Sequence, residues 1–280
     1  MKTLSLITFF CLSSILVIAQ QDSTKKATIT VASLFNSDVS YYGQATSDKM
    51  PYVLVNATLR FPIGLYLSAG SFKLLNYGSG LSETDLGVGI DHDFNEHFNI
   101  GLAFTRSFFP ANSPLLQASN ENNFNLSGTY SWLSMKTSLN ADYAFGEQKD
   151  IFLSLTNSKE ISLGSLFNDK NSVYIEPALE VVAGTRYFYE TYKISKVKRE
   201  KSKGKGPLSP ESSGSPAINS SAVESSNFNL LSYNFKLPLS FSRAGYVAEI
   251  SYQLSVLGAK AAPGLKQQQS FFGLAFYYQF

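Results

Sequence analysis

The sequence is poor in several residue types that carry chemistry. Its 280 residues contain one cysteine, one tryptophan and two histidines. The cysteine, Cys11, lies in an N-terminal segment that we expect to be removed, so the mature chain would have no disulfide, thiol nucleophile or thiolate metal ligand. Basic residues (23) and acidic residues (21) nearly balance, so the chain as a whole gives no electrostatic case for nucleic-acid binding. Beyond the N-terminal segment, no apolar run reaches the roughly 18 residues that a membrane-spanning helix needs.

The N-terminal segment has the pattern of a secretory signal peptide. Lys2 gives it a positive start, an apolar run covers residues 4–19, and polar residues begin at Gln20. We expect cleavage after Ala19, which gives a signal peptide at 1–19 and a single mature domain at 20–280. A lipoprotein site at Cys11 is not favoured, because the bulky Phe10 precedes it.

Aromatic residues are abundant, and they alternate as they would in a β-strand. The chain has 22 phenylalanines and 16 tyrosines at a mean hydropathy of −0.04. The alternation is clearest at 268–280, where one face holds large apolar side chains, namely Phe272, Leu274, Phe276, Tyr278 and Phe280. The other face is mostly small or polar. A strand of a transmembrane β-barrel needs such faces, one toward lipid and one toward the lumen, and the near-zero hydropathy follows from the same arrangement.

Because it ends on Phe280, the last strand resembles the closing strand of Gram-negative outer-membrane β-barrel proteins. The resemblance implies an integral outer-membrane protein with both termini periplasmic. It also implies that the barrel-assembly machinery recognises Phe276, Tyr278 and Phe280. More narrowly, GTRYFYETY at 184–192 and the closing FYYQF resemble small, uncharacterised porin-like barrels. No catalytic or binding residue carries over from that family.

The rest of the chain predicts an all-β fold, a closed antiparallel barrel of about twelve strands, with ten to fourteen within the error of strand ends. The predicted strands are 27–36, 52–61, 65–75, 82–94, 97–109, 122–133, 135–145, 150–167, 172–195, 227–242, 246–256 and 268–280. Links after even-numbered strands are short and those after odd-numbered strands are mostly longer, as for periplasmic turns and outer loops. We expect 184–192 to project beyond the membrane and 196–226, rich in Ser, Pro, Gly and Lys, to be a mobile outer loop.

Closure is expected because unpaired backbone groups are costly in lipid and exposed aromatic strand edges would aggregate. A soluble secreted β-sandwich is the alternative fold. It would require Phe235, Leu237, Leu239 and Phe241 to be buried under a second layer instead of facing outward.

Alternation also predicts which charged residues face the lumen. The predicted lumen residues are Arg60, Asp85, Asp91, Lys136, Asp142, Glu176, Glu180, Lys236 and Glu249, six acids and three bases. Such a lumen would pass small polar solutes or cations as a porin-like channel. The charges can equally pair across the interior and close it, which would leave a non-conducting envelope-complex subunit or surface scaffold. A barrel of about twelve strands lies between the eight-stranded kind, which side chains fill, and the 16–18-stranded porins, which hold an aqueous channel, so the sequence is compatible with both functions.

We expect no enzyme activity, no cofactor and no metal. His92 and His97 in HDFNEH fall in a turn, without the helix of an H-E-x-x-H site. A phospholipase-like serine and histidine pair would need a histidine near the outer leaflet, and both histidines fall on the predicted periplasmic side. The sequence has no nucleophile-elbow motif.

A basic run opens the longest predicted loop. It consists of Lys196, Lys198, Arg199, Lys201, Lys203 and Lys205. The run is either a solvated flexible segment or a contact for lipopolysaccharide phosphates. Nucleic acid is not expected, because no stacking aromatics lie within it. The expected partners are outer-membrane lipid, lipopolysaccharide and the barrel-assembly machinery, with no protein partner identified.

Overall fold

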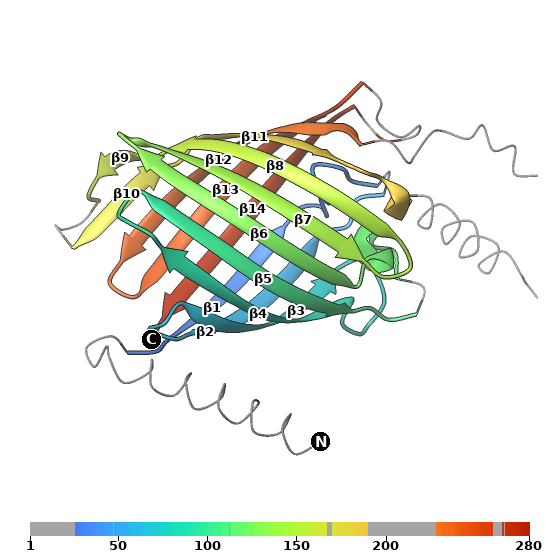
Figure 1. The fold of residues 1–280 in the computed structure, drawn as a ribbon, viewed down its shortest axis with the longest axis horizontal. Coiled ribbons are helices and arrows are strands. Elements are labelled where there is room, and N and C mark those ends of the chain that lie inside the picture. Colours follow the sequence, from blue (N-terminus) through green and yellow to red (C-terminus); the bar gives the residue numbers. More distant parts are fainter. Residues whose placement is uncertain are drawn as a thin grey trace, which may run out of the picture.

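The computed structural model describes residues 26–46, 48–111, 113–166, 170–189, 228–259, 265 and 267–280. The predicted signal peptide, and the predicted outer loop at 196–226 with its basic run, lie outside these residues. The described chain forms one antiparallel sheet that closes on itself (Figure 1). Within the described ranges, no helix is long and apolar enough to cross a membrane.

The strands agree with the predicted ones to within two residues at most ends. They are β1 (Thr28–Asn36), β2 (Tyr52–Arg60), β3 (Leu65–Leu74), β4 (Glu83–Asp93), β5 (Phe98–Phe108), β6 (Asn122–Trp132), β7 (Met135–Phe145), β8 (Lys149–Lys159), β9 (Ile161–Gly164), β10 (Asn171–Ile175), β11 (Ala178–Gly184), β12 (Asn229–Arg243), β13 (Tyr246–Leu257) and β14 (Gln268–Gln279). One short 3₁₀ helix, η1 (Leu116–Ser119), precedes β6.

The fourteen segments make a closed barrel of twelve strands, as predicted. β8 and β9 together span the wall once, and so do β10 and β11, so the count falls from fourteen to twelve. β1 pairs with β14, and β11 pairs with both β8 and β12, which leaves no free edge along the main wall. Consecutive strands pair antiparallel throughout, so each short connection returns the chain to its neighbour.

Two predicted strands are interrupted, which corrects the expectation of one long strand at 150–167 and another at 172–195. The first is divided at Glu160, and the second at Glu176 and Pro177. Pro177 has no N–H, and Glu176 lies opposite Pro238 of β12, which also has none, so the hydrogen-bond ladder is broken there. The Glu176 N–H still donates to the Pro238 carbonyl at 3.2 Å. The strand therefore keeps its course across the gap.

The expectation that the strand continues through 184–192 is wrong for the described part of this segment. β11 ends at Gly184, and the chain then turns inward, so that Phe188 is fully buried and Tyr189 is nearly so. An inward turn covers these rings, whereas a projecting strand would leave them in water.

The outer surface of the barrel is apolar. Phe235, Leu237 and Leu239 keep 60%, 48% and 42% of their surface exposed on β12, and Ile250 keeps 60% on β13. These side chains alternate with the inward-facing polar residues of the same strands. The soluble-sandwich alternative required Phe235, Leu237, Leu239 and Phe241 to be buried, but the first three are exposed and Phe241 is only half-buried. A closed sheet with an apolar exterior and a polar interior is the architecture of an outer-membrane β-barrel.

The two ends of the barrel differ. At the end that holds both Thr28 and Gln279, which we call the terminal end, tight turns such as 61–64 connect the strands. At the opposite end, the loop end, the connection 37–51 and the segment with η1 contribute buried side chains to the interior. Figure 1 shows η1 at this end, opposite the C-terminus. The buried core of the molecule therefore lies at the loop end.

Candidate functional site

Three ion pairs join six of the nine predicted lumen residues. At the terminal end, Arg60 Nη1 lies 2.6 Å from Asp91 Oδ2, and the guanidinium lies 5.0 Å from the centre of the Tyr66 ring. Residues 60 and 66 are cross-strand partners on β2 and β3, so their side chains share the lumen face. The turn at 61–64 thus places a positive charge and an acid together at this mouth.

The other two ion pairs lie side by side on the wall of β7, β10, β11 and β12. Lys136 Nζ lies 3.5 Å from Glu176, and Lys236 Nζ lies 3.0 Å from Glu180. Ser158 donates to Glu176 at 2.8 Å, and Asn234 donates to Glu180 at 2.8 Å. The lysine side chains are 47% and 37% exposed although they point inward. Water therefore reaches this part of the lumen.

The remaining three predicted lumen residues are acids, and none of them has an ion-pair partner among the described residues. Asp142 accepts hydrogen bonds from the amides of Asn123 and Asn125 at 3.0 and 2.9 Å. Glu249 accepts one from Ser240 at 3.1 Å. Asp85 lies on β4 two residues from Glu83, on the same face. The excess of acids over bases gives the lumen a negative balance.

The loop end holds a plug, which we define as residues 37–46, 48–51, 113–120 and 185–189. Its tip is a tight turn in which Tyr41 and Gln44 are bridged. Tyr42 and Gly43 both have positive φ, at 51° and 78°. A Cβ on Gly43 would lie 2.2 Å from Ser232 Oγ of β12, so only glycine fits. The Ser232 hydroxyl also donates to the Tyr42 carbonyl at 2.9 Å, which fixes the tip to the wall.

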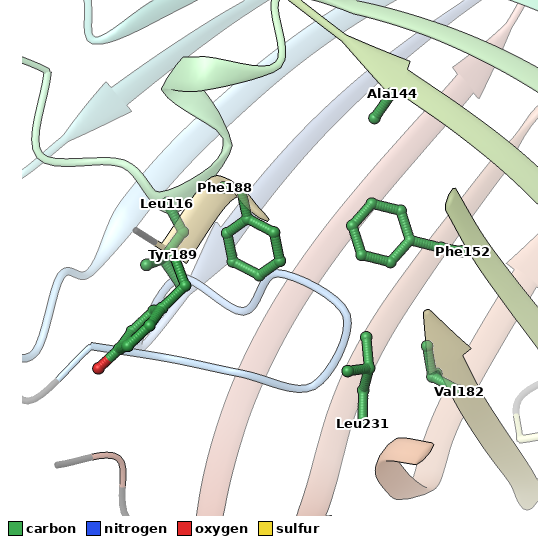
Figure 2. Close-up of a cluster of buried hydrophobic side chains, with 7 residues drawn as sticks. All are labelled: Leu116, Ala144, Phe152, Val182, Phe188, Tyr189 and Leu231. Atoms are coloured by element: carbon green, nitrogen blue, oxygen red, sulfur yellow. The ribbon is translucent and has the colours of Figure 1, made fainter. Parts of the chain in front are cut away.

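Aromatic rings pack the plug against the wall. The Tyr42 ring stacks on Phe152 of β8, with 3.7 Å between ring centres, and Tyr41 meets Phe188 edge-on at 4.9 Å. Phe152 and Phe188 are fully buried. Figure 2 shows Phe188 of the plug across from Phe152 of the wall, with Leu116 behind Phe188 and with Val182 and Leu231 beside Phe152. Burial raises the pKa of the Tyr41 and Tyr42 phenols above the ordinary value, so both stay neutral.

A buried carboxylate holds the last part of the plug. Asp150 at the start of β8 is 0% exposed. Its oxygens accept from Thr185 Oγ1 (2.7 Å), the N–H groups of Tyr187 (2.8 Å) and Phe188 (2.9 Å), and Asn120 Nδ2 (3.0 Å). One anion thereby connects two plug segments. Arg186, which lies between Thr185 and Tyr187 in the sequence, is 4% exposed, and burial lowers the pKa of its guanidinium below the ordinary value.

The sequence interpretation missed the plug, although a signal was present. Apolar side chains occur on the lumen face of several strands, namely Phe72 and Leu74 of β3, Phe152 of β8 and Phe271 of β14. All four lie near the loop end of their strands. An apolar patch on the lumen face needs a cover, and only an inward loop can supply one.

The histidines are placed as expected at the terminal end. His92 meets Phe94 edge-on with 4.7 Å between ring centres, and His97 lies 6.5 Å from the Tyr130 ring. In the part of the chain that the structure describes, no group of three or more histidine, cysteine or acidic residues is arranged to hold a metal. Phe276 and Tyr278 of β14 and Phe280 just after it are exposed, and their recognition by assembly machinery stays a prediction.

Comparisons with known proteins add only the general architecture. No family model matches the chain, and no curated protein matches it. Among solved structures, the KdgM porin has 12% identity, with 90% of this chain and 99% of that chain covered, at a TM-score of 0.48. LpxR from Salmonella typhimurium has 8% identity, 89% and 99% coverage and a TM-score of 0.47. The NanC porin has 6% identity, 89% and 98% coverage and a TM-score of 0.45. At these identities and TM-scores, the neighbours give no information on what this chain binds or passes.

Proposed function

We propose that this outer-membrane β-barrel is a porin-like channel for small polar solutes and cations, closed at its loop end by the plug in the state described here. The observation that carries the proposal is the exposure of the inward-facing ion pairs. Lys236, in the middle of β12, keeps 37% of its side-chain surface exposed, which a side-chain-filled barrel would not leave, and Lys136 near the terminal mouth keeps 47%.

The charge balance of the lumen sets the expected selectivity. Six acids and three bases were predicted to face inward, and the three ion pairs use three of those acids. The remaining acids, Asp85, Asp142 and Glu249, carry a field that favours cations in a narrow, low-dielectric passage.

The plug determines when the channel conducts. Phe188 of the plug and Phe152 of the wall are both fully buried, with 5.9 Å between their ring centres, so passage along this part of the wall requires the plug to move away from it. The wall is a continuous hydrogen-bonded sheet, whereas the plug is held by side-chain contacts and a few hydrogen bonds. Displacement of the plug therefore costs less than distortion of the barrel.

The same plug favours a second function, a non-conducting barrel that serves as an envelope-complex subunit or surface scaffold. In that case the plug would be a permanent core that supports the outer loops. The two functions differ in one measurable property, which is whether the lumen ever opens.

The test is single-channel conductance of the mature protein refolded into a planar bilayer. We expect rare cation-selective openings for the wild type and more frequent openings for Asp150→Ala, which releases the plug. Glu176→Gln/Glu180→Gln should reduce the cation preference, whereas Glu96→Gln, exposed in the turn between β4 and β5, should not. Silence from both the wild type and Asp150→Ala, each folded and heat-modifiable, would overturn the channel and leave the non-conducting barrel.

Both termini are proposed to be periplasmic, which puts the plug on the outer side of the membrane. Support comes from the short turns at the terminal end, since outer-membrane barrels have short periplasmic turns and longer outer loops. Contact of the basic run at Lys196–Lys205 with lipopolysaccharide, and reading of the last strand by the assembly machinery, remain proposals. Protease protection of a tag after Ala19 in intact cells tests the orientation.

A further inference from the structure

A hollow in the lumen wall, which we call the lumen niche, lies on the inner face of β12, β13 and β14. It has a volume of about 220 Å³. Its lining includes Lys236, Pro238, Glu249, Ser251, Gln253 and Gly273. At about 30 Å³ for each water molecule, this is room for about seven waters or one small organic solute.

The niche exists because three neighbouring strands place small residues side by side. Ser251 pairs with Pro238 on one side and with Gly273 on the other. Gly273 contributes no side chain, and a Cβ there would lie 2.5 Å from Ser251 Oγ. The next inward rows carry Gln253 toward the loop end and Glu249 toward the terminal end. The hollow is therefore a row of short residues between two rows of longer polar ones.

The two charges that line the niche differ in how they are partnered. Lys236 is 3.0 Å from Glu180 and is already neutralised. Glu249 accepts one hydrogen bond, from Ser240, and takes part in no ion pair among the described residues. One carboxylate charge at the niche is thus left without a cation. A carboxylate in a partly enclosed site gains more from a bound cation than one on an open surface.

We propose that the lumen niche binds small primary-amine solutes, with Glu249 accepting the ammonium N–H. Ser251 and Gln253 offer a hydroxyl and an amide to other polar groups of the solute, and the Pro238 ring contacts its carbon chain. The niche favours an ammonium group because the Glu249 carboxylate then gains a counter-charge, which a neutral solute could not supply. This inference rests on the proposed function, since it identifies the class of solute that pauses inside the channel.

The binding can be measured without conduction. The niche opens to the lumen, where Lys236 remains 37% exposed, so a solute entering from the terminal end meets it before the plug. The experiment is ligand-observed NMR titration of the folded barrel in a non-ionic detergent at low salt. n-Butylammonium is the probe and n-butanol is its neutral counterpart.

We expect n-butylammonium to bind with a dissociation constant in roughly the millimolar range, weak enough for release from a channel site. Glu249→Gln should weaken it about tenfold, the effect of losing a hydrogen bond to a charged group. Ser251→Leu, which fills the niche and keeps Glu249, should abolish it. Glu96→Gln makes the same charge change at an exposed position in the turn between β4 and β5, on strands that do not line the niche, and should leave affinity unchanged.

The inference is overturned if Glu249→Gln binds n-butylammonium within about twofold of the wild type, or if n-butanol binds equally well. It is also overturned if the folded wild type shows no binding. These outcomes are distinct from failure of the channel. If the barrel binds the amine but never conducts, the niche proposal stands and the channel proposal fails. If it conducts without binding the amine, the channel proposal stands and the niche proposal fails.

Discussion

Replacement of Asp150 by alanine should release the plug while the barrel stays folded. Asp150 is fully buried and accepts hydrogen bonds from Thr185, Asn120 and the N–H groups of Tyr187 and Phe188. A hydrogen bond to a charged group contributes about 1.5–3 kcal/mol, and the lower value for the two backbone donors alone gives about 3 kcal/mol. At 1.36 kcal/mol for each factor of ten, the segment 185–189 should open about a hundredfold more often.

Trypsin cleavage after Arg186, followed by mass spectrometry, measures this opening. Arg186 is 4% exposed in the wild type and is protected while the plug is in place. The control is Asp93→Ala, which removes an exposed carboxylate that accepts from Asn99 at the terminal end. Cleavage after Arg186 within about threefold of the wild-type rate in Asp150→Ala, with heat-modifiability unchanged, would refute the assigned role of Asp150.

Three further changes test other parts of the structure. Gly43→Val places a β-branched residue at a φ of 78° and against Ser232, so cleavage after Arg186 should rise about tenfold as the tip detaches. Leu237→Arg puts a charge on the lipid face and should lower the free energy of unfolding in lipid by about 2–4 kcal/mol, measured by urea titration. The matched control, Thr129→Arg on the lumen face, should lower that free energy by less. Glu180→Gln frees the Lys236 charge and should reduce the potassium-to-chloride permeability ratio about twofold in reversal-potential measurements.

The sequence was sufficient for the barrel because alternation is a local property. Each strand shows its lipid face directly, as Phe272, Leu274 and Phe276 do on β14, and the number of strands follows from the number of such runs. The lumen set followed from the same parity. The interruption at Glu176 and Pro177 was missed although Pro177 and Pro238 were visible. Each proline removes one ladder donor, and the register that brings both losses to neighbouring positions of adjacent strands depends on the closed sheet.

The plug was not predictable in the same way, because its contacts join residues far apart in the sequence. Nothing near Asp150 indicates that its four donors come from Asn120 and from 185–188. Likewise, the fit of Gly43 against Ser232 depends on the closed barrel that brings them together. Sequence parity could have indicated a cover for Phe152, but it could not have identified which loop supplies it.

The pairing of β1 with β14 also constrains how the molecule forms in time. Most strands pair with a neighbour in sequence, so their hairpins form with short loop closures. Thr30 and Gln279, in contrast, can pair only after the strands between them have been placed in the sheet. Until then, the first and penultimate strands both present open edges, which are sites for pairing with other chains. Loss of the last strand would therefore produce an aggregation-prone sheet and not a smaller barrel.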